Sequence, residues 1–419
     1  MELSIVICVY NTPCELFDAT LESIRKSTLL PSGNGRVKGI SHEILVIDDG
    51  SELDYSALVE KYSLRYVKTE NRGIFLARLL GVELAEGRYI VFVDSDDTVT
   101  FNYHRPMLEE AVISGCDIVM NDWAFHTERS RYCCLSDETI SREIREEGDS
   151  VLFRFTKGEG RLHSYYVLWN KLYSAPLLKA AAAMAAKAAE PFGKLSYGED
   201  ALINFFAYKM ASGLRNIHTG YYFYRIHSSQ TVSVTSEEKL LYQIRCMSFV
   251  LSTMEENIGR DNLFGKEIYD SIRGWAGLMS RTHYSYALSR GYTELYPIIK
   301  EKYRVEKLRR STRRDASGYG KNHLLGDNFE AVDEALLGAY LSDSTATLSV
   351  VGNDPYVKEN ISYLRSRGVG LEIGKGGTRV PKMHIKFKNR IIMSAPVYKL
   401  GMLLFPKGSR IRALLKKKL

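Results

Sequence analysis

The chain has 419 residues, of which 45% are hydrophobic and 26% charged, so it has the composition of a globular protein large enough for two or more domains. Its net charge of +7 is a modest excess that gathers towards the C-terminus. No stretch approaches the roughly 18 consecutive apolar residues of a membrane-spanning helix. The six cysteines show no C-x-x-C spacing, which argues against a zinc site or a disulfide framework and favours a reducing compartment.

The first hundred residues are predicted to alternate between strands and helices. Leu3–Val9 (LSIVICV) is a continuous apolar run, which is typical of a strand buried on both faces of a parallel sheet. Thr12-Pro13 opens a helix with one apolar face, and Pro31–Ile40 is a glycine-rich loop. Further strands are predicted at Glu43–Ile47, at Arg65–Lys68 and up to Val93, and further helices at Tyr55–Tyr62 and Gly73–Ala85. This order predicts an α/β fold with a doubly wound, mostly parallel sheet flanked by helices.

The whole chain is predicted to divide into three parts. Strands at Asp117–Asn121 and Tyr221–Ile226 and a helix at Leu177–Ala189 complete a first domain, residues 1–235. From about Ser236 apolar residues recur at helical spacing, which predicts a mainly helical region over residues 236–305. Residues 306–419 form a C-terminal α/β region that begins with the basic segment Lys307–Arg314, contains a strand at TLSVVG and ends in a basic tail.

Acidic side chains gather after two of the predicted strands. Asp48 and Asp49 follow EILVI, and Asp94, Asp96 and Asp97 follow YIVFV. In doubly wound sheets, ligands bind beyond the carboxyl ends of the strands. Carboxylates this close repel one another unless a positive group or ion lies among them. The two clusters therefore predict one site that holds a cation together with an anionic ligand.

Six motifs follow one another over roughly residues 1–235: SIVICVYN, EILVIDDGS, ENRGIFLARLLGVELAEGRYIVFVDSDD, WNKLY, SYGED and YRIHSSQTVS. In this order they resemble the motifs of family 2 glycosyltransferases with the GT-A fold. Cys8 departs from the pattern, because the family usually has proline there. The resemblance implies a GT-A, Rossmann-like fold and the transfer of a sugar from a nucleotide diphosphate, with a UDP-sugar as the expected donor.

The resemblance assigns the DSDD cluster to the donor diphosphate and its metal ion. Mg²⁺ and Mn²⁺ prefer oxygen ligands and often bind one or two carboxylates together with substrate phosphates. In the family pattern, Asp94 lies near the donor ribose and Asp96 binds the metal, while Asp97 supports the site or caps the next segment. His227 resembles a late histidine that reaches the metal or the diphosphate. The alternative for His227 is a loop histidine without a ligand.

Other residues resemble contacts to the nucleotide sugar. Asp49 resembles the acidic residue that accepts from the imide N–H of uracil, and Tyr10 the residue that stacks on the base. Arg78 resembles an arginine that faces the donor, with a surface helix arginine as the alternative, and Asn71 shapes the turn before its helix. For Asp48 two interpretations stay open, a ligand contact or a side chain that ties down the turn.

Asp200, in Gly198-Glu199-Asp200, is the predicted catalytic base. In the family this motif presents a carboxylate at the start of a helix, and a carboxylate in hydrogen-bond contact can remove the proton of an acceptor hydroxyl. The helix N-terminus would help to keep it ionised. Glu199 would orient the acceptor or the base. The alternative is that both side chains only cap the helix.

The C-terminal tail predicts contact with a membrane surface. Lys407–Leu419 has six basic residues, no acidic ones, and four apolar residues on one helical face. Such a helix is typical of a surface anchor, and the alternative is a helix that packs its leucines on the fold. The chain opens without signal-peptide features, so we expect a cytoplasmic protein that is peripheral at the inner face of the cell membrane. Nucleic acid is not an expected partner, because the basic residues are not interleaved with stacking aromatics.

The sequence therefore predicts an inverting, metal-dependent glycosyltransferase that moves a sugar from a UDP-sugar to a hydroxyl of a surface glycan or a lipid-linked precursor. Two other functions stay open. A catalytically silent GT-A domain would act as a binding or assembly module, and UDP release would distinguish the two. A sugar nucleotidyltransferase is less favoured, because the matching GGTR-x-PK segment at Gly376–Lys382 lies near the end of the chain and not after the first strand.

Overall fold

The computed structural model divides the chain into two compact units. The first contains Met1–Thr28, Ile40–Arg129 and Leu135–Asn322, and the second contains Leu29–Gly39, Ser130–Cys134 and His323–Leu419. The structure describes residues 1–31, 37–101, 103–127, 132–135, 145–157, 166–226, 236–259, 261–309, 322–324, 346–351, 370–374 and 384–387.

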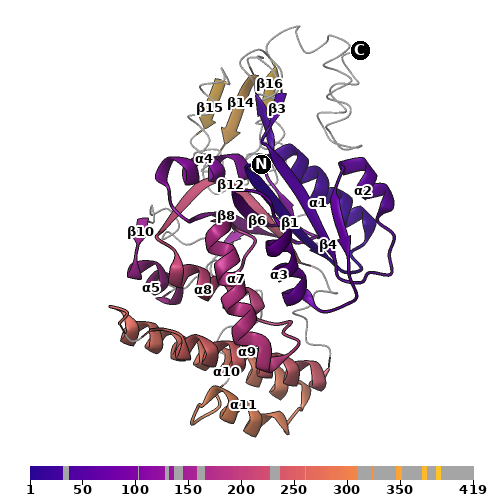
Figure 1. The fold of residues 1–419 in the computed structure, drawn as a ribbon. Coiled ribbons are helices and arrows are strands. Elements are labelled where there is room, and N and C mark those ends of the chain that lie inside the picture. Colours follow the sequence, from indigo (N-terminus) through magenta and orange to yellow (C-terminus); the bar gives the residue numbers. More distant parts are fainter. Residues whose placement is uncertain are drawn as a thin grey trace. The chain divides into compact units, whose positions relative to one another are not determined.

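A mixed sheet forms the centre of the first unit (Figure 1). Its strands are β1 (Leu3–Val9), β4 (His42–Asp48), β5 (Arg65–Lys68), β6 (Tyr89–Phe92), β7 (Thr98–Val99), β8 (Ile118–Thr127), β10 (Arg145–Glu147), β11 (Lys171–Ser174) and β12 (Gly213–Ile226). The strand order is β10-β12-β8-β11-β6-β1-β4-β5. Strand β1 pairs in parallel with β4 and β6, and β8 pairs in parallel with β12, whereas β11 is antiparallel to both β6 and β8.

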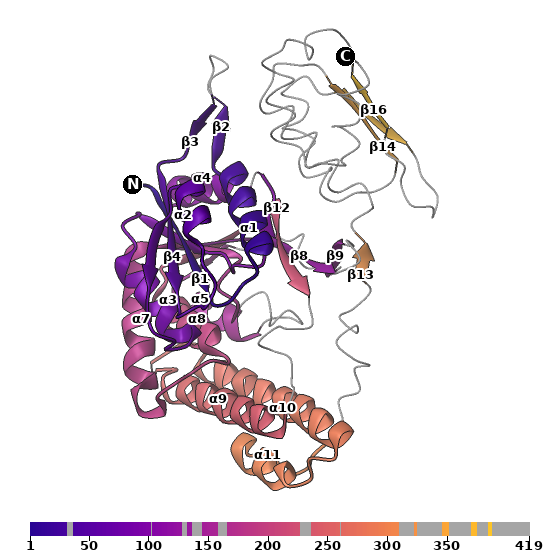
Figure 2. The same cartoon turned by 90° about the vertical axis from the view of Figure 1, so that its right-hand side faces the viewer.

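Helices cover both faces of this sheet. They are α1 (Cys14–Ser27), α2 (Ser56–Tyr62), α3 (Ile74–Leu84), α4 (His104–Ser114), α5 (Asp149–Lys157), α7 (Ala175–Ala189) and α8 (Glu199–Met210). The connection from β1 to β4 and the connection from β5 to β6 run in opposite directions along the sheet. Crossovers of one handedness then place α1 and α3 on opposite faces, as Figure 2 shows. Helix α3 approaches β1 closely, since a Cβ at Gly81 would lie 2.4 Å from the Val6 side chain.

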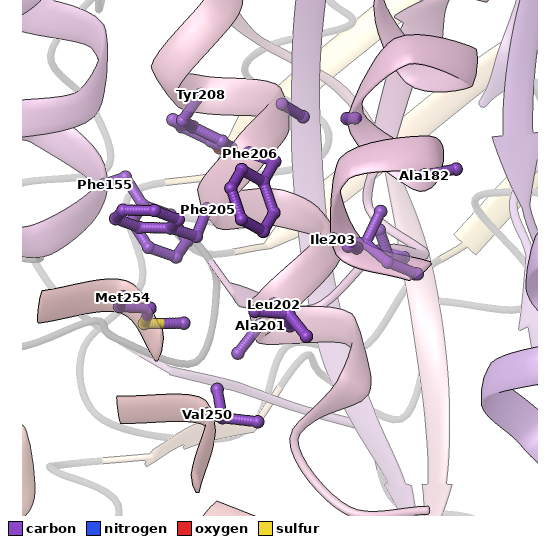
Figure 3. Close-up of a cluster of buried hydrophobic side chains, with 14 of the residues drawn as sticks. Phe155, Ala182, Ala201, Leu202, Ile203, Phe205, Phe206, Tyr208, Val250 and Met254 are labelled. Atoms are coloured by element: carbon purple, nitrogen blue, oxygen red, sulfur yellow. The ribbon is translucent and has the colours of Figure 1, made fainter. Parts of the chain in front are cut away.

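Three further helices complete the first unit: α9 (Glu237–Glu256), α10 (Gly265–Arg290) and α11 (Leu295–Tyr303). Their apolar faces join the same buried cluster as the sheet and α8. Figure 3 shows α8 residues packed between Phe155 of α5, Ala182 of α7, and Val250 and Met254 of α9. Because α8 is surrounded in this way, its N-terminal end is held firmly in place.

The fold class predicted from the sequence is confirmed. The strand at Leu3–Val9 has the predicted bounds and is almost wholly buried, as expected for a parallel strand covered on both faces. The helical region after Ser236 is also present. One local prediction was wrong: the segment Pro31–Ile40 is not a simple loop, because Leu29–Pro31 (β2) and Val37–Gly39 (β3) pair as antiparallel strands.

The second unit contains a small sheet in the order β15-β14-β16. Strand β14 (Ala346–Val351) matches the strand predicted at TLSVVG, and it pairs with β15 (Gly370–Gly374) in parallel and with β16 (His384–Phe387) antiparallel. The basic tail, most of the segment Lys307–Arg314 and the GGTR segment lie outside the described residues. Within the described part of the chain, no helix combines the length and hydrophobicity needed to cross a membrane.

Candidate active site

Most of the predicted site residues lie at the edge of the sheet where β1, β4 and β6 end. Neighbours β4 and β6 lie on either side of β1, so the strand order reverses at β1, and such a reversal opens a crevice beyond the carboxyl ends of the strands. Tyr10 follows β1 and is 53% exposed, so its ring is available to a ligand. Asn11 adopts a positive φ of 52° and accepts from the Glu52 N–H at 2.8 Å, which joins this turn to the one after β4.

Asp48, the last residue of β4, is a structural side chain. It is fully buried and accepts from the Ser51 N–H at 2.7 Å and from the Tyr66 hydroxyl. The Lys68 ammonium lies 3.8 Å from the same carboxylate. Of the two interpretations of Asp48, the contacts favour the one in which it ties down the turn.

Asp49 connects the turn after β4 to the start of α3. Its two carboxylate oxygens accept from the N–H groups of Arg72 and Gly73, each at 2.8 Å. The two turns are tightly apposed, because Gly50 has a φ of 82° and a Cβ there would lie 2.7 Å from the Asn71 nitrogen. An ionised carboxylate has about four lone-pair positions, so Asp49 keeps the capacity to accept from a ligand as well.

Arg78 forms the centre of a buried ionic cluster. It is 6% exposed, and its guanidinium donates to Glu199 at 2.6 Å and to Asp94 at 3.3 Å. Burial opposes the charge of Arg78, but Glu199 and Asp94 outweigh it and raise the pKa. The alternative of a surface arginine is therefore wrong. Arg78 thus links Asp94, in the turn after β6, to the first turn of α8.

The carboxyl groups around Arg78 have raised pKa values. Burial raises the pKa of Asp94, against the effect of Arg78 and with a contribution from the charge of Asp96. Burial likewise raises the pKa of Glu199, again opposed by Arg78. Such perturbed carboxyl groups in one place are typical of a functional site.

Asp97 holds the DSDD turn to the neighbouring strand. It is buried and accepts from the Tyr222 hydroxyl and from the Arg225 N–H, both at 2.7 Å. The Arg225 side chain donates to the Asp96 carbonyl at 2.9 Å, and the Asp94 N–H donates to the Tyr222 hydroxyl at 2.9 Å. Asp97 therefore holds the turn in place through its hydrogen bonds, whereas Asp94 and Asp96 are only partly buried.

Asp200 and Glu199 form the first turn of α8, after Gly198 at a φ of 81°. Burial raises the pKa of Asp200 to about 7, the charge of Glu199 adds to this, and Arg78 opposes it. The Asp200 carboxylate accepts from the Ala201 N–H at 2.9 Å. Asp200 is thus a carboxyl group that titrates close to neutral pH, which is suitable for a general base.

The WNKLY segment, residues 169–173, is buried and packs against residues that hold the site in place. Trp169 is 3% exposed and stacks on Tyr222 with ring centroids 4.3 Å apart, so it packs in the core. Lys171 is fully buried and donates to the Val167 carbonyl at 2.5 Å and to Asn170 at 2.6 Å. Burial lowers its pKa well below the usual value.

The structure brings together most of the residues that the sequence singled out. Arg78, Asp94, Glu199 and Asp200 form one cluster, and Asp49 and Asn71 lie in two apposed turns at the same edge. His227 lies outside the described residues. Sequence reasoning missed Tyr222, Arg225 and Lys194, which act on the site through partners more than 120 residues away. No short motif could have revealed such contacts.

A divalent cation fits the charge of this edge. In the described part of the chain, no group of three or more His, Cys, Asp or Glu side chains has the arrangement of a complete metal site. The charge of Asp96 nevertheless raises the pKa of Asp94, and the charge of Asp94 raises the pKa values of Glu199 and Asp200, with Arg78 opposing each of these shifts. A metal that takes one or two ligands from the protein and the rest from phosphates suits such a site.

Comparison with known proteins agrees with these motifs. Residues 4–157 match the family model "Glycosyl transferase family 2". The protein EpsH of Bacillus subtilis (strain 168), whose name assigns it provisionally to the glycosyltransferases, is 30% identical over 239 residues, which are 55% of this chain and 62% of EpsH. "Glycosyltransferase GlyA" of Streptococcus pneumoniae serotype 4 is 25% identical over 213 residues, which are 49% of this chain and 29% of GlyA.

A solved structure shows a weaker likeness. The crystal structure of S. aureus TarS residues 1–349 in complex with UDP has a TM-score of 0.49 and 18% identity, over 72% of this chain and 80% of that one. The family model thus matches the N-terminal part of the chain, and the curated relatives are named glycosyltransferases. The chain spans 62% of EpsH and 29% of GlyA, so it aligns with less than two thirds of either.

Proposed function

We propose that the protein is an inverting, metal-dependent glycosyltransferase. The donor is a nucleotide diphosphate sugar, with UDP as the nucleotide, and the acceptor is a hydroxyl of a surface glycan or a lipid-linked precursor. One observation carries the proposal. Arg78 contacts both Asp94, at the donor edge of the sheet, and Glu199, which precedes the candidate base Asp200. The residues proposed for the sugar donor and those proposed for the acceptor hydroxyl are thus joined by one buried guanidinium, that of Arg78.

In the proposed reaction, Asp200 is the general base. Its carboxylate takes the proton of the acceptor hydroxyl while that oxygen bonds to the anomeric carbon from the side opposite the leaving group. The bond between the anomeric carbon and the diphosphate oxygen breaks, and the nucleotide diphosphate leaves with the bonding electrons. A pKa of about 7 makes Asp200 a stronger base than an ordinary carboxylate, while a large fraction stays ionised at neutral pH.

On the donor side, we infer that Tyr10 stacks on the base and that Asp49 accepts from its imide N–H. Asn71 and Gly73 shape the turn beside them. Arg78 orients Asp94, which would bind the ribose. These contacts would position the anomeric carbon in reach of Asp200, and such positioning can supply a large part of a rate enhancement.

The residues at this edge suit Mn²⁺ or Mg²⁺. Asp96 would hold the ion, and His227 is proposed as a further ligand from the sequence alone. When bound, the metal would act as a Lewis acid that neutralises charge on the departing diphosphate. Asp97 is not placed in this ligand set, because it is 1% exposed and its carboxylate already holds the turn to Tyr222 and Arg225.

The acceptor side and the membrane contact are proposed from the sequence. Six basic residues in Lys407–Leu419 would attract an anionic leaflet, at about 1 kcal/mol for each charge near the surface. The protein would then work at the inner face of the cell membrane on a lipid-linked acceptor.

A donor screen tests the proposal. The purified protein is incubated with candidate nucleotide sugars, with and without Mn²⁺, and nucleotide release is measured alongside Asp96→Asn. We expect release of UDP that needs metal and that Asp96→Asn abolishes. Full activity in EDTA, or an active Asp96→Asn variant, would remove the metal mechanism. Binding of UDP without any turnover would instead favour a silent binding module.

A further inference from the structure

The loop that leads into α8 carries a lysine across the donor-side turn. Lys194 follows Gly193 and donates from its ammonium to the Asn71 side-chain oxygen at 3.0 Å. Its stem passes directly over Gly73, because a Cβ at Gly73 would lie 2.9 Å from the Lys194 Cε. Gly73 has a φ of 93°, so this position suits glycine on two counts, backbone conformation and space. The lysine and the turn are therefore closely fitted to each other.

Helix α9 holds this loop from the other side. The Tyr242 hydroxyl donates to the Lys194 carbonyl at 2.8 Å. A Cβ at Gly198, the end of the loop, would lie 3.1 Å from the Met247 side chain. The main chain of Lys194 is thus anchored and its side chain is already held over the turn, so little further ordering is needed when a ligand binds. Such anchoring lowers the entropy that binding must overcome.

The turn under Lys194 belongs to the donor side of the site. The N–H of Gly73 donates to Asp49, the residue proposed to accept from the nucleobase. Arg78, by contrast, is engaged by Glu199 and Asp94. An ammonium has three N–H donors, and the contact with Asn71 uses one of them. Lys194 therefore offers N–H hydrogen-bond donors and a positive charge at the place where we expect the oxygen-rich nucleotide to bind.

We propose that Lys194 helps to bind the nucleotide sugar. Its ammonium donates a hydrogen bond to an oxygen of the nucleotide half of that molecule. This inference rests on the proposed function, since it needs a nucleotide sugar at this edge. The positive charge complements the anionic donor. The contacted oxygen belongs either to the uracil and ribose or to the phosphates, and the two cases differ in which ligands are affected.

The test compares Lys194→Met with the parent protein by titration with uridine, UMP and UDP in the presence of Mn²⁺. Methionine keeps the apolar stem but removes the ammonium. We expect UDP to bind about tenfold more weakly, the size of effect typical of a lost hydrogen bond from a charged group. In turnover, the KM for the donor should rise while kcat stays near the parent value, because the contact exists before and during the reaction. Lys194→Arg should restore part of the affinity.

Lys187→Met is the matched control, because Lys187 is exposed in the last turn of α7. It should bind UDP like the parent, and thermal melts of both variants check that the fold is kept. Equal weakening for uridine and UDP assigns the contact to the base or ribose, and weakening only for UMP and UDP assigns it to phosphate. Unchanged UDP affinity and KM in a folded Lys194→Met would overturn the inference while leaving the proposed function intact. A parent protein that binds no uridine nucleotide would overturn both.

Discussion

Two acidic turns end neighbouring regions of the sheet, yet they hold their carboxylates in different ways. In the turn after β4, Asp48 and Asp49 each receive hydrogen bonds from backbone N–H groups nearby. In the turn after β6, Asp94 faces a buried arginine and a second carboxylate, and its pKa is raised by burial. The first turn stabilises negative charge locally, whereas the second turn concentrates it.

The difference shows why an aspartate at the end of a strand is not by itself a functional residue. Backbone N–H groups that donate to a carboxylate stabilise its charge, and at Asp49 they join two loops. Carboxylates gathered around a single cation leave negative charge that a metal or a proton can balance. Asp97 combines both situations, because Tyr222 and Arg225 donate to it, while burial and the charges of Asp96 and Asp94 raise its pKa.

Among changes to the carboxyl groups of this site, the largest effect on activity is expected at Asp200. Asp200→Asn keeps the size of the side chain and its acceptor oxygen for the Ala201 N–H, but the amide cannot take the acceptor's proton. We expect kcat to fall by about 10²–10⁴-fold, as is typical for loss of a general base. UDP affinity and the melting temperature should stay close to those of the parent. If UDP affinity falls as far as kcat, Asp200 is a structural residue and the base lies elsewhere.

A smaller effect is expected from pH, again through Asp200. The reactive form is the carboxylate, so kcat should decrease as pH falls below the pKa of about 7, by about tenfold for each further unit. The charge of Glu199 is a cause of the raised pKa, and Arg78 opposes it. Glu199→Gln should therefore move the acid limb of the kcat profile to lower pH. A profile that does not move would show that Glu199 does not tune the base.

Sequence reasoning predicted the parts of the molecule that depend on local patterns. The apolar run Leu3–Val9 and the α/β alternation gave the sheet, and the carboxyl-end rule placed Asp49 and Asp94 at one edge. The resemblance supplied Arg78 and Asp200, and the structure joins them through Glu199. These successes rest on periodicity and on motif order, both of which are visible in a linear sequence.

The partners of each carboxylate could not be predicted in the same way. Whether Asp97 is a ligand or a brace depends on Tyr222 and Arg225, which β12 brings beside it from over 120 residues away. The antiparallel β11, the β2–β3 pair and the bridge from Lys194 to Asn71 likewise follow from tertiary pairing. Hydrogen-bond partners of this kind carry no local signal, because they depend on packing of distant segments.

The smallest expected effect separates the two carboxylates of the first turn. Asp49→Asn places an NH₂ group against a backbone N–H donor, and Asp48→Asn replaces the charged acceptor of the Ser51 N–H and the Tyr66 hydroxyl by a neutral amide. Each should lower the free energy of unfolding by about 1 kcal/mol or somewhat more. Urea unfolding of the two variants measures this. Only Asp49→Asn should also weaken UDP binding, since only Asp49 is proposed to contact the nucleobase.

If both variants bind UDP like the parent, the first turn is purely structural and base recognition lies with other residues. If Asp49→Asn weakens UDP binding with no loss of stability, its hydrogen bonds to Arg72 and Gly73 contribute little to the fold, and the contrast between the two turns fails.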